Sequence, residues 1–209
     1  MANNTIIVIG RQFGSGGHEV GKRLADRLDI PFYDRNLIQM AAEELGVSHE
    51  KAEEVDETIL GKFLSAYVVG SGDYTMHTEG EHGEKPLSDK LFMAQSDIIR
   101  RLARRGSCII VGRCADYILE NEFQCINAFI YAEIEDRIRR IMRIYNLTEE
   151  EAWTKIKEVD NARKLYYEAH TGSTWGSIES HQMLFNVSLL NISDVVDILA
   201  AMYRARRKD

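Results

Sequence analysis

A glycine-rich segment at residues 10–18, with the sequence GRQFGSGGH, constrains the fold of this chain more than any other feature. It directly follows an apolar, β-branched run at residues 5–9. It directly precedes a segment in which Val20, Leu24 and Leu28 recur every fourth residue. The run before the glycines is typical of a buried strand, and the spacing after them is typical of an amphipathic helix. The sequence therefore predicts a strand, a tight glycine loop and a helix in immediate succession.

This succession predicts a binding site for a phosphate group. The backbone N–H groups of Gly14, Ser15, Gly16 and Gly17 would converge with the positive end of the helix dipole. Glycine permits the positive φ angles and the close approach that such a loop requires. His18, at the expected helix start, could donate to the phosphate when neutral, or its position could be incidental. A tight turn without a ligand is the alternative, although three glycines in four residues exceed what a turn needs.

Further apolar runs bounded by turn residues predict four more buried strands, at residues 30–33, 108–111, 126–131 and 184–187. Helical patterns alternate with these runs. A capping box that begins at Thr148 predicts the start of one helix, and we expect the last helix to begin at Ser193. Regular alternation of strands and helices implies an α/β fold with a parallel sheet.

The composition favours a single globular domain spanning residues 1–209. Hydrophobic residues make up 44% and charged residues 28% of the chain, close to the averages for globular domains. Acidic residues outnumber basic ones and leave a formal net charge of −7, so we expect neither a nucleic-acid partner nor binding to an anionic membrane. The apolar runs are also too short to cross a bilayer. Small anionic ligands remain possible through local clusters of basic residues.

Cysteine and histidine spacing predicts neither disulfides nor a metal site. Cys108, Cys114 and Cys125 are odd in number and form no CxxC pair, which favours the reducing cytoplasm. The histidines likewise lack the spacing of metal ligands. We therefore expect a cytoplasmic protein without a zinc site.

Two familiar nucleotide-binding motifs are incomplete in the glycine segment. Asp34, at the end of the second expected strand, lies about where a dinucleotide fold carries its acidic ribose ligand, but the G-x-G-x-x-G pattern is absent. The P-loop pattern G-x-x-x-x-G-K-[ST] fails because Gly17 stands in place of the lysine and His18 follows it. The predicted phosphate cradle therefore lacks its usual lysine and hydroxyl group.

Several short motifs spread over almost the whole chain resemble the cytidylate kinase-like family, relatives of the nucleoside monophosphate kinases. They are GRQFGSGG at 10–17, VGKRLA at 20–25, IPFYD at 30–34, IVGRCADYIL at 110–119, DNAR at 160–163, YY at 166–167 and FNVS at 185–188.

The resemblance implies a three-layer P-loop kinase fold with a parallel sheet of five strands. A helical insertion at residues 48–90 would close over the acceptor, and a helical lid within residues 137–182 would close over the donor. The implied reaction is transfer of the γ-phosphoryl group of ATP, as its Mg²⁺ complex, to a nucleoside monophosphate such as CMP.

Phosphoryl transfer depends mainly on geometry and positive charge around the transferring group. Arg11 and Lys22 are the candidates to replace the missing lysine. We favour Arg11, whose planar guanidinium can hold two phosphate oxygens, although either residue could be a solvated surface cation.

The resemblance also implies acceptor-binding residues after the second and third strands. Arg113 stands where related kinases carry an arginine that contacts the acceptor phosphate, and Asp116 is the nearest carboxylate. Asp34 and Arg35 follow the second strand, where acceptor recognition begins in relatives. Both aspartates could instead cap the helices that follow. Related kinases carry an aspartate where this chain has Val111, so we name no protein ligand for Mg²⁺.

Within the expected lid, the resemblance implies that Arg137, Arg143 and Arg163 close on the transferring phosphoryl group. An exposed helix face balanced by neighbouring acidic residues is the alternative. Because the usual lysine, hydroxyl and aspartate are missing, a non-catalytic nucleotide- or phosphate-binding module is the alternative function. A Rossmann-type oxidoreductase is a third hypothesis, supported by Asp34 alone.

Overall fold

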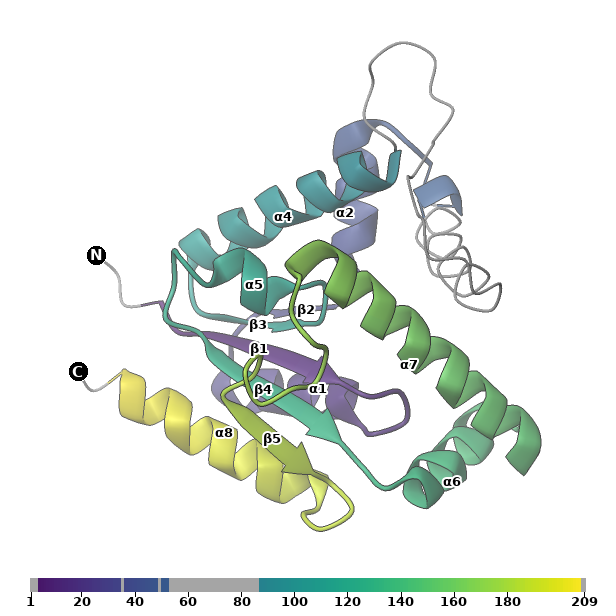
Figure 1. Ribbon diagram of the computed structural model, residues 1–209. Helices are drawn as coiled ribbons and strands as arrows, with labels where there is room; N and C mark the ends of the chain where they lie inside the picture. Colours follow the sequence, from purple (N-terminus) through teal and green to yellow (C-terminus); the bar gives the residue numbers. More distant parts are fainter. Residues whose placement is uncertain (1–3, 35, 49, 53–86, 208–209) are drawn as a thin grey trace.

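A single parallel sheet forms the centre of the molecule. The computed structural model describes residues 4–34, 36–48, 50–52 and 87–207. The strands of the sheet are β1 (Ile6–Arg11), β2 (Phe32–Tyr33), β3 (Cys108–Val111), β4 (Ile126–Tyr131) and β5 (Met183–Asn186). They lie in the order β2-β3-β1-β4-β5, and all neighbouring pairs are parallel (Figure 1). The predicted α/β fold with a five-stranded parallel sheet is confirmed.

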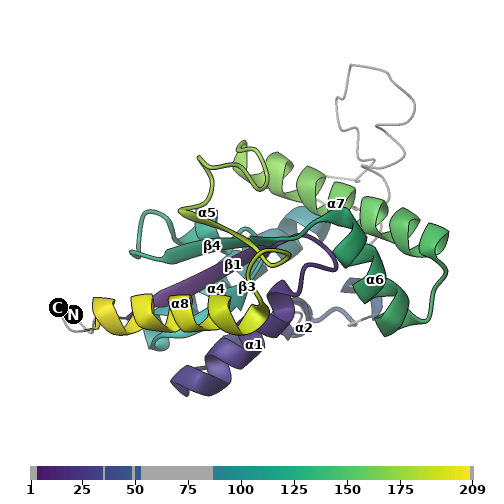
Figure 2. The same ribbon diagram turned by 90° about the horizontal axis from the view of Figure 1, so that it is seen from below.

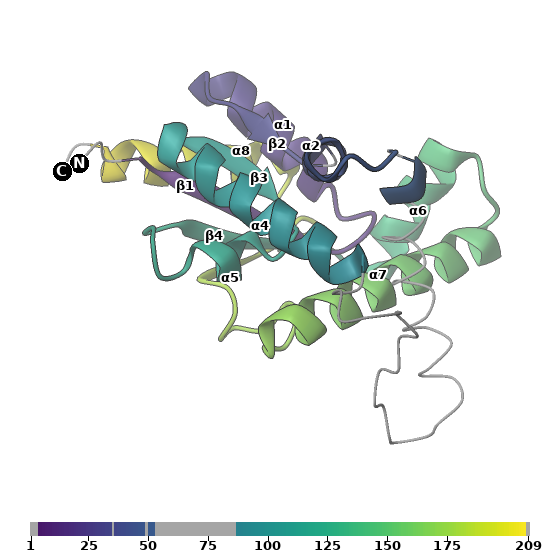
Figure 3. The same ribbon diagram turned by 90° about the horizontal axis from the view of Figure 1, so that it is seen from above.

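Helices cover both faces of this sheet. They are α1 (Gly17–Leu28), α2 (Asn36–Leu45), α4 (Leu87–Arg105), α5 (Ala115–Leu119), α6 (Ile134–Tyr145), α7 (Glu149–Thr171) and α8 (Ile192–Arg206). Side chains of a strand alternate between the two faces. Ile7 and Ile9 of β1 therefore pack with α1 and α8, whereas Ile6 and Val8 pack with α2, α4 and α5 (Figure 2). Figure 3 is seen from the side of α4, which crosses in front of the sheet. The three layers agree with the predicted fold.

The strand boundaries follow from local pairing. β1 extends to Arg11, beyond the predicted end at Ile9, because Gly10 and Arg11 also pair with β4. β2 is shorter than predicted and lies at the edge of the sheet, where it pairs with β3. Just before β2, Pro31 lacks an N–H and only accepts a hydrogen bond, from Ile109 at 2.9 Å.

The capping residues of α7 and α8 explain why the start of α7 was predicted correctly and the start of α8 was not. Thr148 and Glu151 form the predicted capping box at the start of α7. The last helix begins at Ile192 rather than at Ser193, because Asn191 is its N-cap. The Asn191 side chain accepts the Asp194 N–H at 3.0 Å, and the Asp194 carboxylate accepts the Asn191 N–H at 3.2 Å.

The sheet order decides against one alternative. β1 lies between β3 and β4, and β2 is at the edge. A Rossmann sheet places its second strand next to its first. The hypothesis of a Rossmann-type oxidoreductase therefore does not fit this fold.

The two predicted additions to the sheet are described to different extents. Most of the expected acceptor-side insertion at residues 48–90 lies outside the described residues, as does Arg35. The region predicted to contain the lid holds α6 and α7, which pack together through Ile141, Ala152 and Ile156 beyond the carboxyl end of β4 (Figure 1). In the described part of the chain, no helix combines the length and apolar character needed to cross a membrane.

Candidate functional site

The glycine loop between β1 and α1 presents unpaired backbone donors. Gly14 and Gly16 have φ angles of 81° and 90°, which favour glycine. Among the described residues, the N–H groups of Gly14, Gly16, Gly17 and His18 donate no hydrogen bond. These amides are therefore not consumed by neighbouring carbonyl groups, as an anion-binding nest requires. That an anion binds there stays a prediction.

Ser15 anchors the loop rather than facing a ligand with its side chain. Its buried Oγ lies 2.9 Å from the carbonyl oxygen of Gln12 and 3.0 Å from that of Ile130 at the end of β4. Its N–H is 3.4 Å from the Gln12 carbonyl oxygen, a long hydrogen bond. The predicted contribution of Ser15 to phosphate binding therefore concerns its backbone.

The side chain of Arg11 occupies the space beside Gly17. A Cβ atom on Gly17 would lie 2.5 Å from Cβ and 3.0 Å from Cγ of Arg11. The Arg11 guanidinium continues toward Gly112, where a Cβ atom would overlap it. Gly17 thus stands in the lysine position of the loop because Arg11 leaves no room for a side chain there. Arg11 brings a positive charge to this end of the sheet from the strand side.

Asp34 joins two groups of the loop. Its Oδ1 lies 3.4 Å from Nη2 of Arg11, and its Oδ2 lies 2.6 Å from Nδ1 of His18. The carboxylate, which is 11% exposed, therefore faces the loop, and it is the backbone carbonyl of Asp34 that accepts the N–H of Leu37 in α2. The described contacts thus do not match the alternative in which this carboxylate caps α2.

Arg163 of α7 brings a second guanidinium next to Arg11. Its Nη1 donates to the backbone carbonyl of Arg11 at 3.1 Å, and its guanidinium lies 5.6 Å from the ring centre of Phe13. Burial, followed by the charge of Arg11, lowers the pKa of Arg163 to about 9, and Arg113 acts in the same direction. The group remains protonated at neutral pH. Asp160 and Asp34 act in the opposite direction and partly offset the neighbouring cations.

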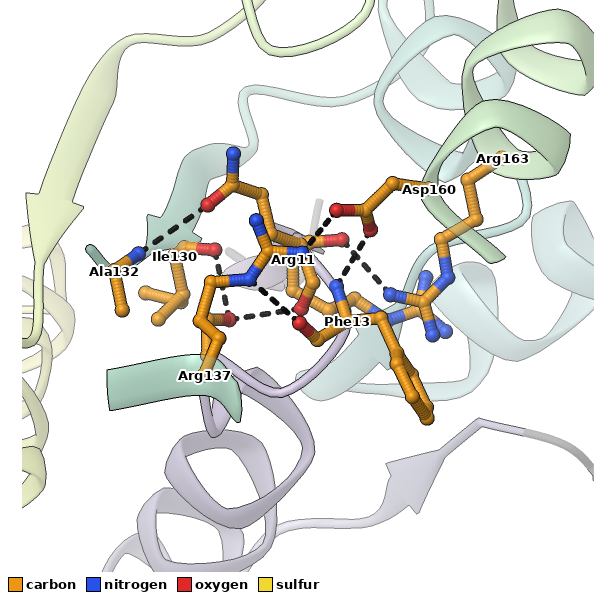
Figure 4. A network of polar contacts seen from close by, with 9 residues as sticks. Arg11, Phe13, Ile130, Ala132, Arg137, Asp160 and Arg163 are labelled. Atoms are coloured by element: carbon orange, nitrogen blue, oxygen red, sulfur yellow. Dashed lines mark hydrogen bonds and ion pairs between the residues drawn. The ribbon is translucent and has the colours of Figure 1, made fainter. Parts of the chain in front are cut away.

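The tip of the loop is held by α6 and α7 (Figure 4). The backbone N–H of Phe13 donates to Oδ1 of Asp160 at 2.7 Å, and the Phe13 carbonyl accepts from Nε of Arg137 at 2.7 Å. Arg137 and Asp160 also form an ion pair with each other. Burial raises the pKa of Asp160, and Arg137 acts against this rise. Arg137 thus contacts the loop backbone, and its predicted catalytic role stays a prediction.

Two residues near the loop escaped the selection of site residues from sequence. Arg140 of α6 places its guanidinium 3.3 Å from where a Cβ of Gly16 would lie, and it pairs with Glu19 of α1. The sequence did contain an indication of Arg140, because it follows Arg137 by three residues and the two side chains therefore share one face of a helix. Asp160 was noticed only within the DNAR motif, and no local pattern indicates that it reaches Phe13.

Other predicted site residues lie apart from the loop. Lys22 forms an exposed pair with Asp26 at 2.6 Å along α1. Arg143 is exposed on α6, and no ion pair is seen for it among the described residues. Both therefore match the alternative of solvated surface cations more closely than Arg11 does.

Asp116 belongs to a buried polar cluster beyond β3. The Tyr167 hydroxyl donates to its Oδ2 at 2.6 Å, and Nδ1 of His181 lies 3.7 Å from the same oxygen. Burial and the charge of Asp116 raise the pKa of Tyr167, while burial lowers the pKa of His181. The N-cap of α5 is Cys114, so capping by Asp116 is not observed. Arg113, three residues before Asp116, has a positive φ of 61° at the turn after β3.

Fold and loop together place the chain in the structural class of the P-loop kinases. The sheet order, the glycine loop between β1 and α1, and the cations around it are the features that support this class. A sequence profile of the Cytidylate kinase-like family matches residues 6–189, and the chain belongs to this family.

Individual relatives agree with this assignment. A cytidylate kinase of Ignicoccus hospitalis is 24% identical over 200 residues, which are 95% of this chain and 98% of that protein. The crystal structure of an uncharacterized protein from Eubacterium ventriosum is similar with a TM-score of 0.67 and 26% identity, covering 95% of this chain and 97% of that one. Shikimate kinase from Bacteroides thetaiotaomicron shares the fold, with a TM-score of 0.51 and 15% identity over 96% of this chain and 98% of its own.

Proposed function

We propose that the protein transfers the γ-phosphoryl group of ATP, bound as its Mg²⁺ complex, to a nucleoside monophosphate such as CMP. Membership of the cytidylate kinase-like family and the similarity to a cytidylate kinase support the class of reaction and the choice of CMP. Base recognition would fall to the insertion at residues 48–90, most of which lies outside the described residues.

The observation that carries this proposal is the set of unpaired amides at Gly14 and Gly16–His18, with Arg11 lying along Gly17. The amides would hold the donor phosphates, and Arg11 would supply the charge that the missing lysine provides elsewhere. Arg163 is close enough to Arg11 for the two charges to affect each other. Fixed positive charge in a partly buried site stabilises the charge that develops on the transferring group.

Acceptor binding would use residues at the carboxyl ends of β2 and β3, where parallel α/β sheets place their ligands. Asp34 follows β2, and Arg113 follows β3. Arg113 would hold the acceptor phosphate.

The described residues do not offer a dedicated magnesium site. They contain no group of three His, Cys, Asp or Glu side chains that could hold a metal ion. Asp34, a carboxylate beside the loop, already faces Arg11 and His18. Mg²⁺ usually keeps several waters and binds through substrate phosphates, so it would arrive with the nucleotide.

The test is an assay of ADP release coupled to NADH oxidation, with MgATP and each common nucleoside monophosphate in turn. We expect turnover that depends on the acceptor and is fastest with CMP. The same rate of ADP release with and without every acceptor would contradict the proposal.

A non-catalytic nucleotide-binding module is the second candidate, because Arg11 is paired with Asp34 and Val111 replaces the aspartate of related kinases. Tight binding of MgATP without turnover, unchanged in Arg113→Gln and Arg163→Gln variants, would favour this candidate.

A further inference from the structure

Both backbone polar groups of Phe13 are held by a buried ion pair from α6 and α7. Asp160 accepts the Phe13 N–H, and Arg137 donates to the Phe13 carbonyl, each at 2.7 Å (Figure 4). The side chains of Arg137 and Asp160 are only 6% and 17% exposed. Burial of two charges costs desolvation energy that their attraction only partly returns. A contact that merely closed the loop would not require charged partners, since Phe13 already packs against the apolar cluster around Ile141.

The two hydrogen bonds fix two consecutive peptide planes. In a trans peptide the C=O and the next N–H lie in one plane and point in opposite directions. Arg137 holds the Phe13 carbonyl and thereby sets the direction of the unpaired Gly14 N–H. Asp160 holds the Phe13 N–H and thereby sets the direction of the Gln12 carbonyl, which contacts the Oγ of Ser15 at 2.9 Å.

The helix that carries Arg137 also stands directly against the first glycine of the nest. A Cβ atom on Gly14 would lie 3.2 Å from both the Cβ and the backbone oxygen of Arg137. The shape of the loop at Gly14 is therefore set by α6 and, through the ion pair, by α7. The loop and the two helices form one unit held together at Phe13.

We propose that Asp160 is a positioning residue for the phosphate loop, which acts with Arg137 to preset the direction of the loop amides. While α6 and α7 hold Phe13, the loop amides are already oriented when the donor phosphates bind. Without that contact they are not. Loss of the pair raises the cost of ordering the loop when an anion binds, and this cost appears as weaker binding. The inference rests on the proposed phosphate-binding role of the loop, but it does not require phosphoryl transfer.

The test measures binding of inorganic tripolyphosphate to the full chain by titration calorimetry, well below the unfolding temperature. Asp160→Asn keeps an oxygen that can accept from Phe13 but removes the charge that faces Arg137. We expect its affinity for tripolyphosphate to fall about tenfold, in line with the loss of a charge-assisted contact. Glu158→Gln is the matched control, because Glu158 is an exposed carboxylate of the same helix. Its affinity should stay within about twofold of the wild type.

A second variant and a second readout separate positioning from stability. Arg137→Lys keeps the buried positive charge but removes the Nε donor to Phe13, and we expect it to weaken binding in the same direction. Hydrogen exchange of the amides at Phe13 and Gly14 should become faster in both variants, while exchange in β3 stays slow. Because both residues act on one loop, the double variant Asp160→Asn/Arg137→Lys should bind tripolyphosphate with no lower affinity than the single variant that binds it less tightly.

Affinities of Asp160→Asn and Arg137→Lys that both stay within about twofold of the wild type would overturn the inference. A wild-type protein that binds no tripolyphosphate would overturn it as well. Binding of tripolyphosphate without transfer to any nucleoside monophosphate would contradict the proposed function and leave this inference intact. If Asp160→Asn does not fold, Arg137→Lys decides by the same criterion.

Discussion

The glycine loop and the cluster around Asp116 are two polar regions beside the same sheet, and they differ in what they leave available. At the loop, the side chains of Asp160 and Arg137 hold the backbone of Phe13, and the Ser15 hydroxyl donates to the Ile130 carbonyl. Among the described residues, the amides of Gly14 and Gly16–His18 stay unpaired. At the cluster, Tyr167 and His181 turn toward the Asp116 carboxylate itself. Charged residues near strand ends are thus a weak indication of a binding site. Donors that the surrounding contacts orient but do not consume are a stronger one.

Substitution of Arg11 should have the largest effect. Arg11→Ala removes the guanidinium charge, which lies beside Gly112 at the carboxyl end of β3. We expect turnover to fall about 100-fold or more, as for the loss of one fixed stabilising charge. Rates with CMP and MgATP measure this change. Arg139→Ala, which removes an exposed arginine paired with Asp136 on α6, is the control and should keep its rate. If the Arg11→Ala variant turned over as fast as the control, Arg11 would have no role in catalysis.

Restoring the lysine of the usual motif should harm the protein. In Gly17→Lys, the new side chain would collide with Arg11, whose Cβ is 2.5 Å from the required Cβ position. Overpacking of this kind costs about 1–3 kcal/mol of unfolding free energy. The double variant Arg11→Gly/Gly17→Lys, which removes both the Cβ and the Cγ of residue 11, should recover most of that loss in urea denaturation. An unchanged stability of Gly17→Lys would show that the loop does not share space with Arg11 as described.

The buried cluster should respond in stability and not in turnover. Tyr167→Phe leaves Asp116 without the hydroxyl that donates to it at 2.6 Å, and such a loss costs about 1–3 kcal/mol. We expect a lower urea midpoint with the rate of phosphoryl transfer per folded molecule unchanged. A rate that falls more than the stability explains would place this cluster in the site and break the contrast with the loop.

The smallest effect concerns pH. Burial lowers the pKa of His170 and of His181, so the unfolded chain binds protons more readily than the folded one. Stability is then fully present above the unfolded pKa of about 6.5 and is lost as the pH falls below it. Urea denaturation at a series of pH values from 8 to 5 (roughly the range in which histidine titrates) measures this loss. His170→Gln should make the curve flatter, and an equally steep curve would exclude His170 as a contributor.

The sequence predicted the framework of the sheet because its strands are uniformly apolar and the glycines mark a loop that few other residues can form. β3 and β4 begin and end where their apolar runs do, whereas β2, which pairs with β3 at the edge of the sheet, is limited to Phe32–Tyr33. The start of α8 was misplaced because Asn191 and not Ser193 satisfies the first amides.

The candidate site was harder to predict, because its contacts join distant parts of the chain. The glycines and Arg11 are neighbours in sequence, so local pattern indicated both. Asp160 reaches Phe13 over 147 positions, and only tertiary packing reveals that Arg137 serves the loop backbone. Lys22, although near the loop in sequence, pairs along the exposed side of α1 because helix geometry places Asp26 four residues on.

The shared space of Arg11 and Gly17 has an evolutionary consequence. A larger residue at position 17 would clash with Arg11, and a smaller residue at position 11 would lose the positive charge. The two positions should therefore change together over generations. A descendant that regains lysine after Gly16 should carry glycine where this chain has Arg11, and intermediates with both side chains should be rare.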